Sequence, residues 1–166
     1  EEAAKLINAA KWAPTHRLTQ PWRFTVFMEQ GLRDFGQFHA ELYKANAPTD
    51  AFSQMKYDKI LNRAKLSSAI IVVGVKKDPF NKVPFLEEIA ATSAAVQNMA
   101  LMATAYGLAF YWGTGGMTFS EEMKLHVGLE AEDQVLGQLF LGYPAGEWPR
   151  KTPRKPMEYF TDWRID

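Results

Sequence analysis

The sequence predicts an α+β fold built on one hydrophobic core. The chain has 166 residues, which suits one domain better than two. Short apolar runs typical of strands are interleaved with helical stretches, but strand–helix–strand units are too few for a doubly wound parallel sheet. One helical stretch is long and free of charge, which indicates a helix that protein covers on nearly all sides.

The order of the elements follows from hydrophobic periodicity and from turn residues. Residues 69–75 are a continuous β-branched run, typical of a strand covered on both faces. Ser120 precedes two acids that suit the positive end of a helix, and Gly107 suits the residue after a helix end. Strands are expected at residues 23–28, 69–75, 110–112 and 134–141, and helices at 1–12, 32–42, 54–65, 87–106 and from 120 onward.

Composition excludes several classes of partner and site. Lys plus Arg and Asp plus Glu both number 19, so no net charge draws the chain to nucleic acid or to an anionic membrane. The absence of cysteine excludes disulfides, a thiol nucleophile and a thiolate metal site, and with only three His no metal site is expected. The 13% aromatic content suits a pocket for a flat small molecule. A reducing, cytoplasmic location fits this composition.

The helix at residues 87–106, which carries no charge from residue 89 onward, bears on assembly. A membrane span is disfavoured because Thr92, Gln97 and Asn98 interrupt a stretch that is mostly Ala. Since a chain of this size has little material to cover such a helix, we expect a homodimer that shares it. The alternative is that it is the central helix of a monomer.

Several stretches resemble the nitroreductase family. Residues 13–24, Ala-Pro-Thr-His-Arg-Leu-Thr-Gln-Pro-Trp-Arg-Phe, are similar to the family's loop, which closes with Gln-Pro-Trp before a strand. Residues 92–107 resemble its central helix, residues 112–115 its Trp and following small residues, and residues 135–144 its last core strand. Residues 43–66 match least.

The resemblance implies an architecture and a cofactor. The family fold is a sandwich with a mainly antiparallel mixed sheet flanked by helices, and two subunits interlock through their C-terminal tails. One domain over residues 1–166 and two FMN molecules at the dimer interface are implied. Family members begin with an Arg-containing motif that grips the FMN phosphate. Because no such motif is present, we expect the given sequence to begin after it.

The resemblance also implies which residues bind FMN. His16 approaches the flavin from its loop, with Trp12 and Gln20 nearby, and small residues at 113–115 allow backbone N–H groups close to the ring. A basic residue after the last strand reaches the phosphate, with Arg154 the first choice and Lys151 the second. The alternatives are a loop-capping histidine, core tryptophans, an ordinary glycine loop and a solvated basic run. His39 and His126 are expected to be structural. The full set is Trp12, His16, Gln20, Trp112, Gly113, Thr114, Gly115, Arg154 and Lys151.

The predicted function is hydride transfer through FMN. NAD(P)H reduces the flavin, which then reduces a nitroaromatic, a quinone or a similar small acceptor, so no side-chain acid or nucleophile is required. A dehalogenase-like reductase is one alternative, with residues 46–65 as its substrate-covering lid. A non-catalytic flavin-binding module and a cofactor-free interaction domain are the others.

Overall fold

The computed structural model describes residues 1–148 and 152–165. Every helix and strand expected from the sequence is present, with its ends displaced by a few residues at most. The elements are α1 (Glu2–Ala10), η1 (His16–Leu18), β1 (Trp22–Met28), α2 (Glu29–Asn46), α3 (Gln54–Leu66), β2 (Ala69–Val75), α4 (Phe85–Ala105), β3 (Ala109–Gly113), α5 (Glu121–His126), β4 (Gln134–Gly142) and η2 (Met157–Tyr159).

The four strands form one antiparallel sheet in the order β1-β2-β4-β3. The α+β class and the mainly antiparallel sheet are therefore confirmed. Among the described residues no parallel pair occurs, so the expectation of a mixed sheet is corrected for this part of the chain. Helices α2 and α3 follow β1 in the chain and pack on each other as a hairpin. They connect β1 to β2, which runs antiparallel to β1.

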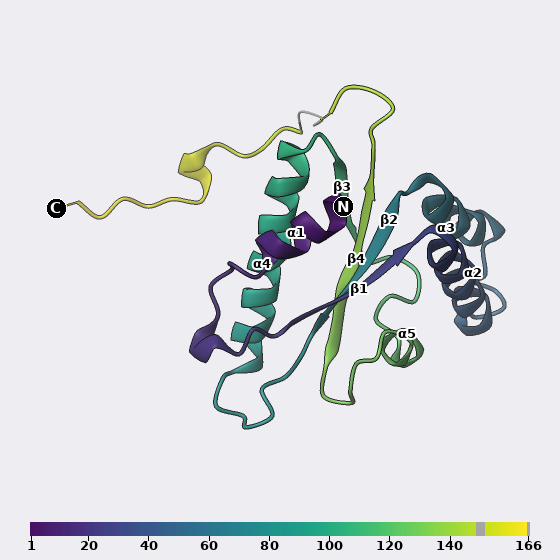
Figure 1. Ribbon diagram of the computed structural model, residues 1–166, viewed down its shortest axis with the longest axis horizontal. Helices are drawn as coiled ribbons and strands as arrows, with labels where there is room; N and C mark the ends of the chain where they lie inside the picture. Colours follow the sequence, from purple (N-terminus) through teal and green to yellow (C-terminus); the bar gives the residue numbers. More distant parts are fainter. Residues whose placement is uncertain (149–151, 166) are drawn as a thin grey trace.

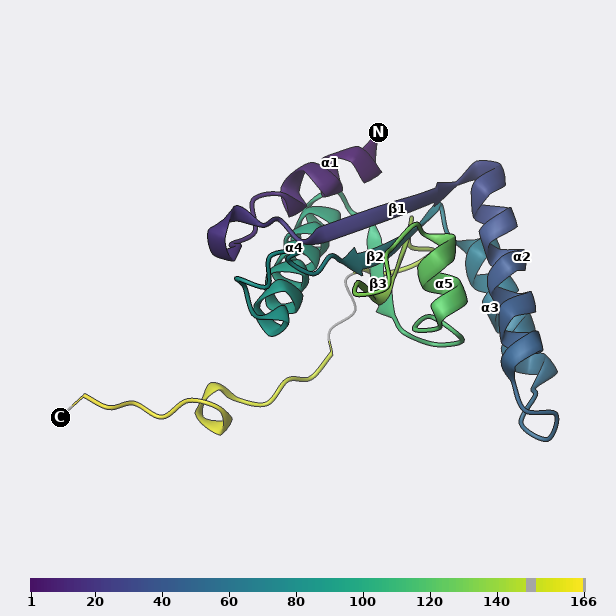
Figure 2. The same cartoon turned by 90° about the horizontal axis from the view of Figure 1, so that it is seen from below.

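Helices cover both faces of the sheet (Figures 1 and 2). Helices α1 and α4 lie on one face, and α2, α3 and α5 lie on the other. Successive side chains of β2 point to opposite faces of the sheet, so they contribute to two core clusters. Ile71 and Val73 belong to the cluster under α1 and α4, whereas Ile70 and Val72 belong to the cluster on the α2–α3 face. All seven residues of β2 are buried, as the sequence predicts.

Helix α4 is covered on one side only within a single chain. Ala95 and Met99 are fully buried in the core, but Leu86 and Leu101 on the outer face are 75% and 63% exposed. The expectation of protein on nearly all sides is thus not met by this chain alone. In the described part of the chain, no helix combines the length and hydropathy needed to cross a membrane.

Residues 152–165 run as an extended arm away from the helices and the sheet (Figures 1 and 2). Its only regular turn is η2. The arm carries five large apolar side chains that are all more than half exposed, which are Met157, Tyr159, Phe160, Trp163 and Ile165. Apolar side chains of this density on an exposed segment indicate a surface that another molecule covers.

Candidate functional site

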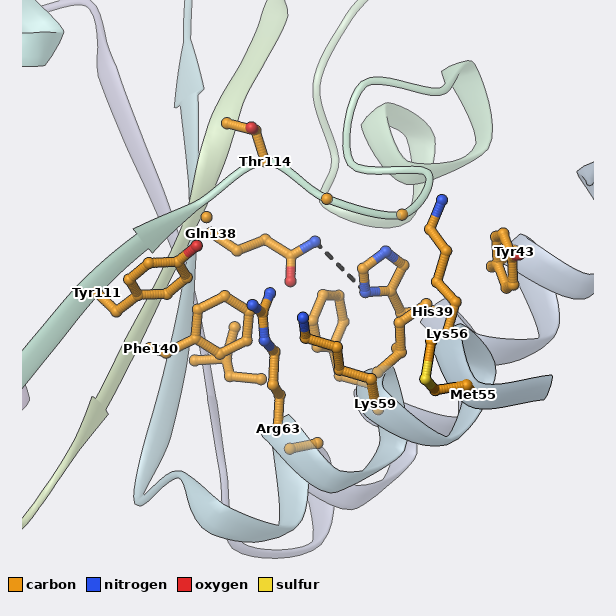
Figure 3. Close-up of a pocket in the computed structure, with 18 of the residues that line it drawn as sticks. His39, Tyr43, Met55, Lys56, Lys59, Arg63, Tyr111, Thr114, Gln138 and Phe140 are labelled. Atoms are coloured by element: carbon orange, nitrogen blue, oxygen red, sulfur yellow. Dashed lines mark hydrogen bonds between the residues drawn. The ribbon is translucent and has the colours of Figure 1, made fainter. Parts of the chain in front are cut away.

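A cavity of about 540 Å³ opens between α2, α3 and the loop that follows β3 (Figure 3). Its walls combine aromatic rings, three basic side chains and the glycine-rich loop. The lining residues are Phe35, Gly36, His39, Tyr43, Ala51, Ser53, Met55, Lys56, Lys59, Ile60, Arg63, Ala64, Ile70, Tyr111, Gly113, Thr114, Gly115, Gly116, Gln138 and Phe140.

The loop at residues 113–116 brings bare backbone to the cavity wall. A Cβ at Gly113 would stand 2.9 Å from the Tyr111 ring and 3.0 Å from the Phe140 ring. Gly116 has a positive φ of 71°, which glycine adopts without steric cost. Among the described residues, the backbone N–H groups of Thr114, Gly115 and Gly116 have no hydrogen-bond acceptor. The loop therefore offers donors to an oxygen or a ring nitrogen of a ligand.

His39 links this loop to helix α2. The backbone N–H of Met117 donates to His39 Nε2 at 3.3 Å. Burial lowers the pKa of His39 to about 4, and the positive charge of Arg63 acts in the same direction. The ring is therefore neutral at pH 7, and because Nε2 accepts, its proton is on Nδ1.

The amide of Gln138 is the most deeply buried polar group of the cavity. Its residue is 1% exposed, its Nε2 donates to Thr118 Oγ1 at 2.8 Å, and Nε2 lies 3.4 Å from His39 Nδ1. Its Oε1 is buried and has no hydrogen-bond partner in the described part of the chain. Turning the amide over would pair its oxygen with the Nδ1 proton, but it would remove the donor to Thr118 Oγ1, which itself donates to the Gly115 carbonyl at 2.6 Å. In either orientation one amide atom lacks a partner among the described residues, and a water or a ligand would satisfy it.

Three cations lie on one face of α3 because positions 56, 59 and 63 follow the helical period. The Arg63 guanidinium lies over the rings of Tyr111 and Phe140, 5.2 and 5.3 Å from their centroids. None of the described carboxylates forms an ion pair with Lys56, Lys59 or Arg63, and no acidic residue lines the cavity. The cavity is therefore electropositive and suits a planar ligand with electron-rich or anionic edges.

The residues predicted to bind the cofactor lie in separate parts of the structure. Gly113, Thr114 and Gly115 line the cavity. Trp112 is next to them in sequence, but it pairs with Leu139, whose side chain belongs to the core under α1 and α4. Since side chains alternate along a strand, Trp112 faces away from the cavity, and its indole N–H donates to the Leu136 carbonyl at 3.2 Å.

The loop that contains His16 lies elsewhere in the chain. His16 Nδ1 lies 2.5 Å from Glu87 Oε2, and Thr19 Oγ1 donates to Glu88 Oε2 at 2.7 Å, so the start of α4 holds this loop. The loop precedes edge strand β1 on the α4 face, whereas the cavity adjoins the opposite edge strand β3 on the α2–α3 face. One copy of the chain therefore does not bring the two groups of predicted residues together.

The remaining predicted residues are exposed or lie outside the described residues. Trp12 is 77% exposed at the end of α1. Gln20 has a positive φ of 47°, and its backbone N–H donates to Thr15 Oγ1. Arg154 is exposed in the arm and bonds only to nearby carbonyl oxygens among the described residues. Lys151 falls outside the described residues.

Lys56, Lys59, Arg63 and Gln138 line the cavity but were not predicted as site residues from the sequence. His39, for which a structural role is expected, also lines it. The spacing of the three cations at i, i+3 and i+7 within residues 54–65 was the available signal. Nothing local in the sequence marks Gln138, whose partner His39 is 99 residues away.

Comparison with known proteins decides the family. The family model described as "Nitroreductase family" matches residues 1–143. The chain belongs to the nitroreductase family. The predicted family and enzyme class, an oxidoreductase of the nitroreductase type, are therefore confirmed.

Relatives of known sequence or structure agree with this assignment. YfhC of Bacillus subtilis and YdjA of Escherichia coli, both named as NAD(P)H nitroreductases, are each 28% identical, covering 89% and 87% of this chain and 76% of their own. A nitroreductase-like protein of Bacillus cereus superposes with a TM-score of 0.77 at 27% identity, covering 97% of this chain and 82% of its own. A nitroreductase from Desulfovibrio desulfuricans, solved with FMN, gives 0.66 at 25% identity and covers 97% and 83%.

Proposed function

We propose that this nitroreductase-family chain binds FMN in the cavity between α2, α3 and residues 113–116, takes hydride from NAD(P)H and reduces small acceptors such as nitroaromatics or quinones. The observation that carries the proposal is the buried Gln138 amide, one atom of which has no hydrogen-bond partner among the described residues. The names of the relatives and the FMN-bound neighbour support the same cofactors. FMN supplies a ring that accepts hydride from a nicotinamide and passes it to an acceptor. A cytoplasmic location, where NAD(P)H is abundant, is part of the proposal.

The residues of the cavity fit the polar edge of a flavin ring. That edge presents carbonyl oxygens, ring nitrogens and one N–H, which require both donors and an acceptor. Arg63 and the backbone N–H groups of residues 114–116 supply donors, and the Gln138 amide supplies either kind of partner. Tyr111 and Phe140 supply apolar walls. This donor set matches a flavin better than a simple anion, which would leave the amide oxygen unpaired.

The chain's own part in the reaction is positioning and electrostatics. Arg63 lines the cavity and would supply a positive charge to the negative charge of a bound, reduced flavin, and a charge fixed in advance costs no reorganisation. Neutral His39 accepts a hydrogen bond from the Met117 backbone N–H and adds no competing charge. Aromatic walls keep water from one side of the ring. Because hydride transfer needs no protein nucleophile, we assign none.

A homodimer completes the site in this proposal. Trp12, His16 and Gln20 lie far from the cavity of their own chain, so they are proposed to face the cavity of a second copy. The exposed face of α4 and the apolar arm at residues 152–165 offer the surfaces that a second copy would cover. Light scattering after gel filtration tests this assembly, with a dimer expected. A monomer with full FMN affinity would contradict it.

The phosphate of FMN is proposed to lie against the basic tail, with Arg154 as the first candidate and Lys151 as the second. Trp112 is 38% exposed and is proposed to contact the partner copy or the cofactor from outside the cavity. The dehalogenase-like alternative has no specific support, because residues 46–65 belong largely to α3, whose Lys56 and Lys59 line the cavity wall.

Steady-state oxidation of NADPH and NADH tests the activity. The full-length protein, reconstituted with FMN, is assayed with and without a nitroaromatic or a quinone, and consumption of the nucleotide is followed by its near-ultraviolet absorbance. Acceptor-dependent consumption is expected. Bound FMN without any consumption would favour the non-catalytic flavin module instead.

A further inference from the structure

The cationic face of α3 extends beyond the aromatic end of the cavity. Lys59 lies one helical turn from Arg63, about 6 Å along the axis, and Lys56 lies about 10 Å away. Arg63 alone lies against the rings of Tyr111 and Phe140. Figure 3 shows Lys59 beside Arg63, and Lys56 on the far side of His39 toward Tyr43. The two lysines therefore line the part of the cavity beyond the two rings that Arg63 covers.

Acidic residues on the same helices are occupied elsewhere. Asp58 accepts a hydrogen bond from Gln54 at 2.8 Å, and Glu41 accepts one from Tyr57 at 2.5 Å. Lys56 Nζ lies 4.7 Å from the centroid of the Tyr43 ring, a contact that orients the ammonium without neutralising it. Like charges on one helix face repel one another. The arrangement is therefore expected to be stabilised by an anion.

A flavin ring requires one cation at its polar edge, and Arg63 fills that role in the function proposed above. Lys56 and Lys59 then remain as two cations that line the cavity and have no assigned role. We propose that they form an anion subsite that binds the carboxylate of the electron acceptor, so that the preferred acceptors are small aromatic acids. This inference rests on the proposed function and specifies its substrate class.

The position of the lysines favours the acceptor over the nucleotide donor. Both line the same cavity as Gly115 and Gly116, so an anion that they bind lies inside this cavity. The diphosphate of NAD(P)H is separated from its nicotinamide by a ribose, whereas an aromatic acid carries its charge directly on its ring.

The test compares a charged and a neutral acceptor of the same shape. FMN-saturated protein is reduced with dithionite, without any nucleotide, and mixed with para-nitrobenzoate or para-nitrobenzamide in a stopped-flow instrument. For wild type we expect a rate ratio that favours the acid and declines with added salt. In the double variant Lys56→Gln/Lys59→Gln we expect this ratio to fall about fivefold to tenfold. The Lys56→Arg/Lys59→Arg variant should retain the ratio.

Direct binding gives a second readout. The dissociation constant of benzoate, measured by calorimetry on the oxidised protein, is expected to rise about fivefold to tenfold in the double Gln variant. Lys65→Gln is the matched control, because Lys65 is exposed on the same helix but does not line the cavity. It should leave both the rate ratio and the benzoate affinity at the wild-type values.

The outcomes separate the two proposals. If FMN binds and is reduced by NADPH, but wild type shows no preference for the acid, the anion subsite is overturned and the proposed function stands. If the double Gln variant slows only reduction by NADPH, the lysines serve the donor's diphosphate and the inference is again overturned. Failure of the protein to bind FMN at all counts against the proposed function itself.

Discussion

The backbone of Gly116 lies so close to His39 that a Cβ at position 116 would stand 2.5 Å from His39 Nε2. The positive φ of Gly116, 71°, adds a second reason for glycine at this position. This contact fixes the glycine-rich loop against helix α2, which is how two distant parts of the sequence form one wall of the cavity.

Gly116→Ala is therefore expected to lower the free energy of unfolding by about 1–3 kcal/mol. Urea denaturation measures the change. Gly115→Ala is the matched control, because no atom lies within 4 Å of a Cβ built there, and a change below about 0.5 kcal/mol is expected. Equal losses in both variants would contradict the close contact with His39.

Protonation of the buried His39 ring is expected to lower the stability of the protein in acid. Burial lowers the pKa of His39 to about 4, whereas in the unfolded chain it lies near 6.5. Because the folded pKa is the lower one, the contribution is complete above about pH 6.5 and declines as the pH falls toward 4. The decline amounts to about 3 kcal/mol. His39→Gln lacks this proton, so the difference in unfolding free energy between wild type and variant should shift by this amount between pH 7 and pH 4; a constant difference would argue against it.

Trp112 and Gly137 should be energetically coupled. A Cβ at Gly137 would lie 2.1 Å from Trp112 Nε1, so Gly137→Ala must displace the indole or the backbone of β4. In a Trp112→Ala background that conflict is removed in part. A double-mutant cycle on urea unfolding should therefore give a coupling energy of about 1–2 kcal/mol. Additive effects would show that the indole does not restrict position 137.

Arg63→Gln is expected to weaken FMN binding by about tenfold or more, since a hydrogen-bonded charge at the polar edge of the ring is lost. Titration of FMN followed by quenching of its fluorescence measures the dissociation constant. Arg63→Lys should recover part of the affinity, because it keeps the charge but not the planar fork. Lys65→Gln controls for a general loss of positive charge on α3. An unchanged affinity in Arg63→Gln would remove Arg63 from the site.

Glu87 tests whether the His16 loop serves the cavity of a partner copy. The His16–Glu87 pair is about half exposed on both sides, so Glu87→Gln should cost no more than about 1 kcal/mol of stability. If the loop completes the partner's cavity, FMN affinity should fall by several-fold despite this small cost. Glu122→Gln, an exposed acid at the start of α5, is the control. Loss of stability without loss of FMN affinity would indicate a purely structural loop.

The sequence was informative wherever the signal was local. The side chain of Ser120 accepts a hydrogen bond from the Met123 backbone and caps α5, as its position before two acids predicts. The β-branched run at residues 69–75 became strand β2 with the same ends and complete burial. Both features depend on residues within a few positions of one another.

The cavity was not predictable in the same way because its contacts join distant residues. His39 meets Gln138 across 99 positions, and His16 meets Glu87 across 71. Arg63 lies in the segment that least resembles the family. The exposed arm and the outer face of α4 depend on a second molecule in the proposed dimer, which a pattern in one chain indicates only indirectly.

The most direct test of the central claim is the visible spectrum of the full-length, FMN-reconstituted protein under anaerobic conditions. We predict a bound-flavin band that bleaches on addition of NADPH or NADH and returns on addition of a nitroaromatic or a quinone. A protein that binds no FMN after reconstitution, or whose flavin band ignores both nucleotides, would contradict the account.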